Sequence, residues 1–211
     1  MWILIVVIAL IVILALIVLV TYNGLVRARN MCDEAWSTID VQLKRRHDLI
    51  PNLVETVKGY AQHETEAFEN VTKARAAAIG ARTPAEAGKT ESLLTAALGQ
   101  LFAIAEAYPQ LRAVESFTQL QAELANTEDQ IAAARRVYNG NVQAYETKRQ
   151  QFPGVLIAGP GGFSPRQYFE LENQADREPV KVDFGTAAPA TPSAPPPADA
   201  PPADPAPPTG A

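Results

Sequence analysis

The chain opens on an uninterrupted apolar run. Residues 2–20 carry no charged side chain and are almost all Ile, Leu and Val. As a helix, which rises ~1.5 Å per residue, the run spans roughly 28 Å, close to the ~30 Å hydrocarbon core of a bilayer. In lipid the backbone must bond internally, so the helix forms despite its β-branched residues. The run has neither the basic leader nor the Ala-x-Ala exit of a cleaved signal peptide. We therefore expect an uncleaved transmembrane anchor over residues 1–22.

Apolar residues continue after the anchor at helical spacing. The stripe keeps its phase through Pro51, so we expect one long helix kinked there, while a break at Pro51 stays open. Arg46 and Glu64 stand where the spacing calls for an apolar residue, which predicts an ion pair or a rim position for each. The inward positions are Leu25, Ala28, Cys32, Ala35, Ile39, Leu43, Ile50, Leu53, Val57, Tyr60, Ala67, Val71, Ala74 and Ala78.

A second helix begins at a strong start signal. Thr83 supplies an N-cap, Pro84 the first helical position and Glu86 an acidic residue three places after the cap. Pro109 ends this helix. Its predicted inward residues are Leu94, Ala97, Leu98, Leu101, Ala105 and Tyr108.

A third helix is predicted over about residues 110–151, ending at a Phe-Pro-Gly sequence. The glycines and prolines that follow, through Gly162, predict a loop. Residues 165–171 are long enough for a short fourth helix carrying Tyr168 and Phe169. The inward residues of the third helix are Leu111, Val114, Phe117, Leu120, Leu124, Ile131, Tyr138, Val142 and Tyr145.

No segment alternates apolar and polar residues for long enough to predict a sheet. The expected fold is therefore all-α: a transmembrane helix, then an antiparallel bundle of three long helices, with or without the short fourth, over residues 23–172. Residues 173–211 are expected to be a linker and a disordered tail. The last 25 residues, 187–211, hold ten Pro and nine Ala, which leave little to bury. We expect a spacer or solubilising tail, although Pro-x-x-Pro spacings also occur in it.

Charge and composition exclude several classes of protein. The formal net charge of -5 disfavours nucleic acid as a partner. His63-Glu64 begins like a zinc-protease helix, but Ala67 stands where the second histidine is needed. Gly88-Lys89-Thr90 ends like a phosphate-binding loop, without the earlier glycine or a preceding strand. We expect no catalytic residue, no metal site and no cofactor.

The polar stretch after residue 39 is the strongest candidate site. A run of charged residues is more often a solvated helix face whose side chains form ion pairs with acidic neighbours. The functional interpretation is a docking surface for a partner protein. Its residues are Asp40, Lys44, Arg45, Arg46, His47 and Asp48. Tyr138 and Asn139 also allow two interpretations, a hydrogen bond between helices or recognition of a ligand. The hydrogen bond between helices is favoured.

Several blocks of this sequence together form a long and specific pattern. They are RN at 29–30, AWSTIDVQLKRRHDLIPNLV at 35–54, VKGY at 57–60, HE at 63–64, YP at 108–109, RVYN at 136–139 and FP at 152–153. These blocks resemble the LemA family of bacterial membrane proteins, over roughly residues 1–172. The resemblance implies an N-terminal transmembrane helix with a very short outer terminus, a cytoplasmic helical bundle and no assigned enzymatic activity. Members are often encoded beside membrane zinc proteases or other envelope proteins, which points to envelope quality control. Tyr145-Glu146, where members commonly repeat Tyr-Asn, and the Pro/Ala tail depart from the pattern.

Basic residues beside the anchor predict its orientation. Arg27 and Arg29 follow the apolar run, whereas only Met1 precedes it, so we expect the N-terminus outside and the body in the cytoplasm. Arg27 and Arg29 are then the lipid headgroup contacts of a protein in the bacterial inner membrane. An exported body stays open as an alternative.

Three functions follow from these features. The first is a membrane-anchored scaffold or adaptor that binds another envelope membrane protein through the bundle. The second is an exported structural protein that spans the envelope. The third is a metal-binding or enzymatic bundle, which would need ligands from outside the chain. A homo-oligomer is compatible with all three.

Overall fold

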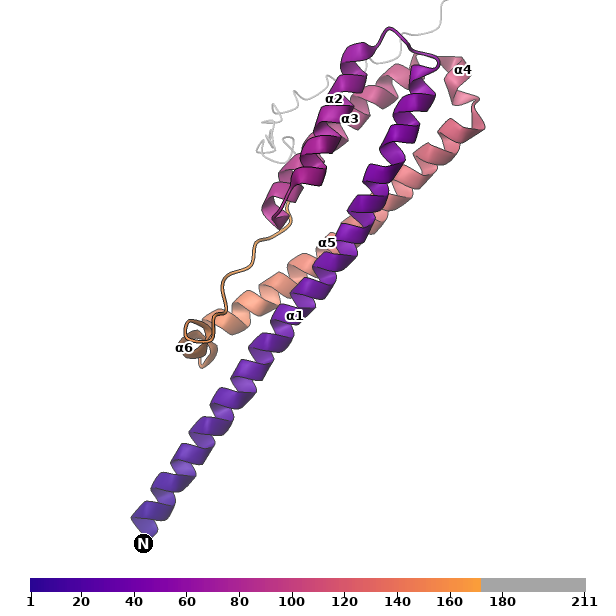
Figure 1. Cartoon of the computed structure of the whole chain (residues 1–211). Coiled ribbons are helices and arrows are strands. Elements are labelled where there is room, and N and C mark those ends of the chain that lie inside the picture. The colour runs from indigo at the N-terminus through magenta and orange to yellow at the C-terminus, as the bar shows by residue number, and fades with distance from the viewer. Residues whose placement is uncertain (172–211) are drawn as a thin grey trace, which may run out of the picture. The chain divides into compact units, whose positions relative to one another are not determined.

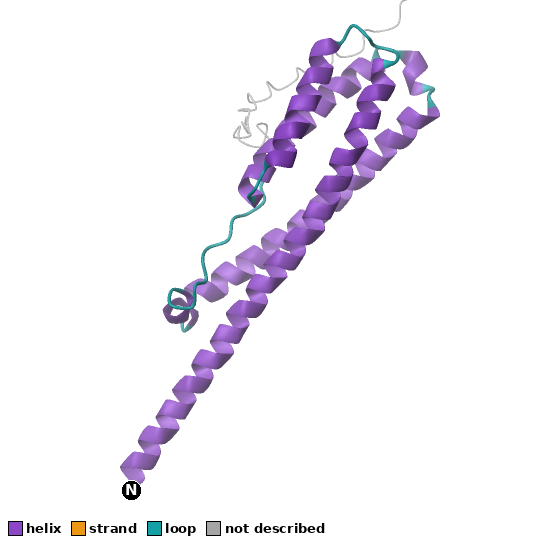
Figure 2. Cartoon of the chain, in the orientation of Figure 1, coloured by secondary structure: helices purple, strands orange, loops and turns teal. Residues whose placement is uncertain are grey.

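The computed structural model describes residues 1–171, and these form helices joined by short loops, with no strand among them (Figures 1 and 2). The all-α prediction is confirmed. The predicted linker and tail, residues 173–211, lie outside the described residues. The helices are α1 (Trp2–Lys58), α2 (Thr65–Gly80), α3 (Pro84–Glu106), α4 (Pro109–Arg112), α5 (Glu115–Gln150) and α6 (Gly154–Ala158).

Helix α1 is continuous over 57 residues and passes through Pro51 without a break, as the unbroken apolar phase predicts. Its first part, residues 2–20, is exposed along its whole length and is long and apolar enough to cross a membrane. From Leu25 to Val57 the predicted inward residues are all buried. One helix therefore carries both the exposed apolar run and a wall of the bundle.

The stripe does not continue into one longer helix, and this part of the prediction is wrong. Helix α1 ends at Lys58, and α2 begins at Thr65 after a turn. Tyr60, predicted to face inward, is half-exposed, whereas Ala61 is buried and its amide bonds to the Val57 carbonyl. Glycine at position 59 weakens the helix. Folding back lets Phe68 and Val71 be buried, whereas a straight continuation would leave them in water.

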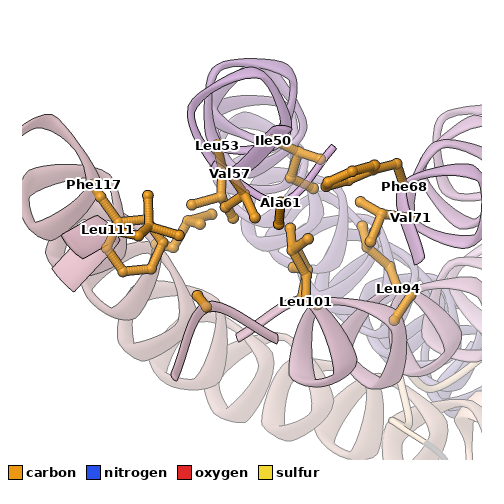
Figure 3. Packing of buried hydrophobic residues seen from close by; sticks show 14 of the residues in the cluster. Ile50, Leu53, Val57, Ala61, Phe68, Val71, Leu94, Leu101, Leu111 and Phe117 are labelled. Carbon is orange, nitrogen blue, oxygen red and sulfur yellow. The ribbon is translucent and has the colours of Figure 1, made fainter. Parts of the chain in front are cut away.

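Helix α5 runs beside the second half of α1, and α2 and α3 form a hairpin that packs along the same end of the bundle (Figure 1). Thr83 caps α3, accepting a hydrogen bond from the Glu86 amide, as predicted. Two hydrophobic cores result, and we call them proximal and distal because the first lies nearer to the apolar run along α1. The distal core contains Ile50, Leu53 and Val57 of α1 with Phe68, Val71, Leu94, Leu101, Leu111, Phe117 and Leu124, most of which Figure 3 labels. These residues belong to α1, α2, α3, α4 and α5. The proximal core contains Leu25, Ala28, Cys32, Ala35, Ile39, Leu43, Ala87, Ile131, Tyr138, Val142, Tyr145, Ala158, Phe163 and Phe169.

The end of the described chain also corrects the prediction. Residues 165–171 are extended rather than helical, and the short helix α6 lies inside the predicted loop (Figure 2). Residues 164–171, which we call the strap, cross the proximal core, and Phe169 is fully buried beside Trp36, with ring centroids 5.7 Å apart. A helix would have bonded the strap's backbone to itself. Here the backbone bonds instead to side chains of α5.

Candidate docking surface and its buried support

A layer of polar residues lies between the two hydrophobic cores. Arg46 and His47 of α1 fall between Leu43 in the proximal core and Ile50 in the distal core. The same interruption occurs on α3, where Glu91 lies between Ala87 and Leu94, and on α5, where Thr127 and Glu128 lie between Leu124 and Ile131. We call Arg46, His47, Glu91, Thr95, Thr127 and Glu128 the polar layer.

Arg46 is the centre of this layer. Its guanidinium Nη1 lies 3.1 Å from Glu91 Oε2 and 3.0 Å from Glu128 Oε2, and Nη2 donates to Thr95 Oγ1 at 2.8 Å. Arg46 is only 4% exposed, and Glu91 only 1%. The predicted ion pair at this interruption of the stripe is confirmed, and its partners come from two other helices.

His47 completes the layer. Its Nε2 lies 2.6 Å from Glu91 Oε1, within hydrogen-bonding distance. The two oxygens of one buried carboxylate are thus divided between neighbouring residues of α1. Removing one partner of such a group leaves a buried charge without compensation, so the layer fixes the register of α1 against α3.

The six predicted docking residues do not form one surface. Arg46 and His47 point into the bundle, and Arg45 lies 3.7 Å from Glu123 of α5, with both side chains half-exposed. Asp40, Lys44 and Asp48 are exposed and follow one line along α1, each four residues from the next. They border a groove of about 310 Å³, which we call the α1 groove. It is lined by Trp36, Asp40, Leu43, Lys44, His47, Asp48, Ala78, Ile79, Ala81 and Ala87.

The predicted headgroup contacts, Arg27 and Arg29, lie on α1 just beyond the apolar run. Arg27 is exposed, whereas Arg29 is partly buried, with its guanidinium carbon 5.5 Å from the centre of the Phe163 ring. Asp33, one turn further along α1, pairs with Arg166 of the strap at 2.8 Å.

Tyr138 and Asn139 bind the strap, so the predicted hydrogen bond between helices is wrong. Tyr138 Oη donates to the Gln167 carbonyl at 2.7 Å, and burial raises the Tyr138 pKa to about 12. Asn139 makes two bonds to Phe169, donating to its carbonyl and accepting from its amide. These side chains replace the backbone partners that a helix would have provided.

Tyr145 and Glu146 hold the strap two turns further along α5. Tyr145 Oη donates to the Ser164 carbonyl, and Glu146 accepts from the Arg166 amide. Partial burial works against ionisation of Glu146, but hydrogen bonds from Arg149, from the Arg166 backbone and from Gln150 outweigh it and lower the Glu146 pKa. The pair that departs from the family pattern therefore anchors the strap as well.

The sequence-based prediction missed Glu91, Thr95 and Glu128. A signal for Glu91 exists, because it stands among the apolar positions of its helix, between Ala87 and Leu94. An acidic residue in one buried stripe and a basic residue in another are natural partners. Which of the many exposed acids of α5 approaches Arg46 depends on the packing of the helices.

Within residues 1–171, the side chains that could act as nucleophiles, bases or metal ligands lie apart from one another. Cys32 is fully buried, and burial raises the pKa of its thiol. His63 lies exposed in the turn before α2, away from the buried His47. Among residues 1–171, no three side chains of His, Cys, Asp or Glu are grouped so as to hold a metal ion. The absence of catalysis, metal and cofactor stays a prediction.

An exposed apolar helix that continues into a packed helical bundle defines a membrane-associated helical protein. The chain belongs to the LemA family, whose model matches residues 35–184. That match begins at Ala35, where the resembling block of α1 begins.

Three named relatives are similar to this chain over more than half of its length. Magnetosome protein MamQ 2 of Paramagnetospirillum magneticum is 26% identical over 184 residues, which cover 75% of this chain and 68% of the relative. Magnetosome protein MamQ of Magnetospirillum gryphiswaldense has the same identity and coverage. Protein LemA of Metamycoplasma hominis is 28% identical over 134 residues, 62% of this chain and 60% of the relative. None of these names is that of an enzyme.

Proposed function

We propose that this protein is a membrane-anchored adaptor without catalytic activity, which binds an envelope membrane protein through the α1 groove. Residues 1–22 are the anchor in the bacterial inner membrane, residues 23–172 are the cytoplasmic bundle, and residues 173–211 are the linker and tail. Arg27 and Arg29 contact lipid headgroups, and their charge keeps the body on the cytoplasmic side. Envelope quality control is the process that we assign to it.

The division of charges between the two sides of α1, over residues 40–48, supports this proposal. Arg46 and His47 are satisfied by Glu91 inside the bundle, so they hold this part of α1 rigidly in place. Asp40, Lys44 and Asp48 alternate in sign along the exposed side of the same part. Rigid presentation of charges lowers the entropic cost of association.

The lining of the α1 groove indicates what the partner carries. Ile79 is exposed at its edge and Trp36 is partly buried in it, which suits an apolar side chain of the partner. Two acidic residues flank Lys44, so the partner segment carries basic residues on either side of an acidic one. Such complementarity governs specificity and association rate.

Photocrosslinking in intact cells tests the proposal. The full chain carries a photoreactive residue at Lys44 in one strain and at Val137, an exposed position of α5, in another. We expect an envelope membrane protein to be captured from position 44 only, and to be lost when Asp40 and Asp48 are both changed to Lys. Capture unaffected by this reversal, or equal from both positions, would contradict docking at the α1 groove. Capture of a second copy alone would indicate a homo-oligomer instead.

A further inference from the structure

The segment around α6 is unusually apolar for the surface of a bundle. Residues 152–163, which we call the α6 segment, contain no charged side chain. Three of its large apolar side chains are exposed: Phe152 at 80%, Val155 at 53% and Leu156 at 66%. Ala158 and Phe163 face the proximal core and hold the segment in place. The exposed side chains therefore belong to an ordered, outward apolar face.

Contacts with α1 place this segment beside the end of the apolar run. The Phe163 ring packs edge to face on Tyr22, with centroids 5.3 Å apart, and Tyr22 follows the last residue of the run by two positions. Asn141 of α5 donates to the Met31 carbonyl of α1. The two helices run in opposite directions, each advancing ~1.5 Å per residue, so the end of α5 at Gln150 lies level with about residue 22 of α1. Figure 1 shows α6 at this end of α5, beside α1.

Basic and aromatic residues lie on α1 and at the end of α5, next to the elements that the α6 segment joins or contacts. Arg27 and Lys148 are exposed, and neither takes part in an ion pair within residues 1–171. Arg29 covers the Phe163 ring, and Tyr22 lies on its edge. Aromatic rings at the level of the headgroups, with cations that reach the phosphates, are characteristic of segments that lie in a membrane interface.

We propose that the α6 segment is a second membrane contact, in which Phe152, Val155 and Leu156 insert into the interface of the bilayer that α1 spans. This rests on the proposed anchoring of residues 2–20. The position of the α6 segment, level with the end of the apolar run and packed on Tyr22 through Phe163, favours lipid over a protein partner. A helix that crosses a bilayer alone is free to rotate about its axis. A second contact on one side of α1 removes that freedom and fixes the direction in which the α1 groove faces.

Spin-label accessibility in the full chain tests this inference. Single cysteines replace Val155 or Leu156 in the chain, where native Cys32 is fully buried, and the labelled protein is reconstituted into vesicles of phosphatidylcholine and phosphatidylglycerol. Leu93 and Val137, exposed to a similar degree at 63% and 59%, are the matched positions on α3 and α5. Leu10 in the anchor reports membrane insertion itself.

We expect labels at 155 and 156 to be relaxed more by oxygen than by a water-soluble nickel complex, as at Leu10. Labels at Leu93 and Val137 should show the reverse. Nickel accessibility at 155 and 156 equal to that at Val137, with Leu10 still in lipid, would overturn the second contact and leave the anchor intact. Protection from both reagents would overturn it in favour of a protein partner or a second copy. Nickel accessibility at Leu10 would contradict the anchor and the second contact together.

Discussion

Arg75 of α2 donates a hydrogen bond through Nε to the main-chain carbonyl of His47 in α1, at 2.7 Å. In a regular helix this carbonyl accepts the amide hydrogen of residue 51. Residue 51 is a proline, which has no amide hydrogen, so the carbonyl is free to accept from another helix. Pro51 therefore creates the acceptor that ties α2 to α1.

This relationship predicts a coupling between the two side chains. Arg75→Ala should lower the free energy of unfolding by about 1–2 kcal/mol in the natural chain, because the carbonyl loses its partner. In a Pro51→Ala background the helix supplies its own amide, and the same change should cost less than about 0.5 kcal/mol. Chemical denaturation in detergent micelles measures the free energy of unfolding of the natural full chain, the two single variants and the double variant. An equal cost in both backgrounds would show that Arg75 does not act through the vacated carbonyl.

The polar layer predicts that Glu91 matters far more than an exposed acid. Glu91→Ala should lower the free energy of unfolding by about 3–5 kcal/mol, because it strips Arg46 and His47 of a buried partner. Glu123→Ala removes only the half-exposed pair with Arg45 and should cost less than about 1 kcal/mol. Denaturation midpoints of the two variants make the comparison. Similar losses would mean that the layer does not stabilise the register of the helices.

Two glycines of α3 predict opposite effects of the same change. A Cβ at Gly88 would overlap the Glu170 carbonyl oxygen of the strap, whereas nothing lies within 4 Å of one at Gly99. Gly88→Ala should therefore displace the strap and cost about 1–3 kcal/mol. Gly99→Ala should stabilise α3 by about 0.5–1 kcal/mol, since alanine favours the helix. Thermal unfolding tests both, and faster amide exchange at Phe169 in Gly88→Ala alone would locate the first effect in the strap.

The raised pKa of Tyr138 predicts a loss of stability at high pH. Its pKa is raised from 10.0 to about 12 in the folded chain. The folded state thus holds the phenolic proton more tightly than the unfolded state. This contribution is complete below pH 10 and is lost as the pH rises from 10 towards 12. Tyr138→Phe should unfold with a smaller dependence on pH over this interval. An unchanged dependence would place the high-pH effect on another group.

Periodicity predicted the helices that pack through one continuous face. The spacing of Leu25, Cys32 and Ile39 specifies the buried side of α1, and the interruption at Arg46 indicates an ion pair. Both follow from local sequence because the helical period determines which residues share a face. The turn after Lys58 was missed because the apolar spacing beyond it happens to continue in phase. The burial of Phe68 and Val71 against other helices determines that the chain turns after Lys58, and no local sequence pattern indicates this burial.

The strap and the polar layer show where prediction from sequence ends. Residues 164–171 stay extended because Tyr138, Asn139, Tyr145 and Glu146 bond to their backbone from α5. Those side chains lie about 20–30 positions away in sequence, so a window on the strap contains no trace of them. Likewise the docking residues form one cluster in sequence, yet the helix turns Arg46 and His47 inward and Lys44 outward.

In the proposed function, α1 anchors the bundle with Lys44 and its neighbours on the cytoplasmic side. Cysteine labelling in spheroplasts tests this most directly, using Lys44→Cys in the full chain with a maleimide that does not cross membranes. Cys32 is fully buried, so the parent chain gives the background. We expect no labelling of position 44 until the membrane is broken, and full labelling afterwards. Labelling in intact spheroplasts would contradict it and show that the body is exported.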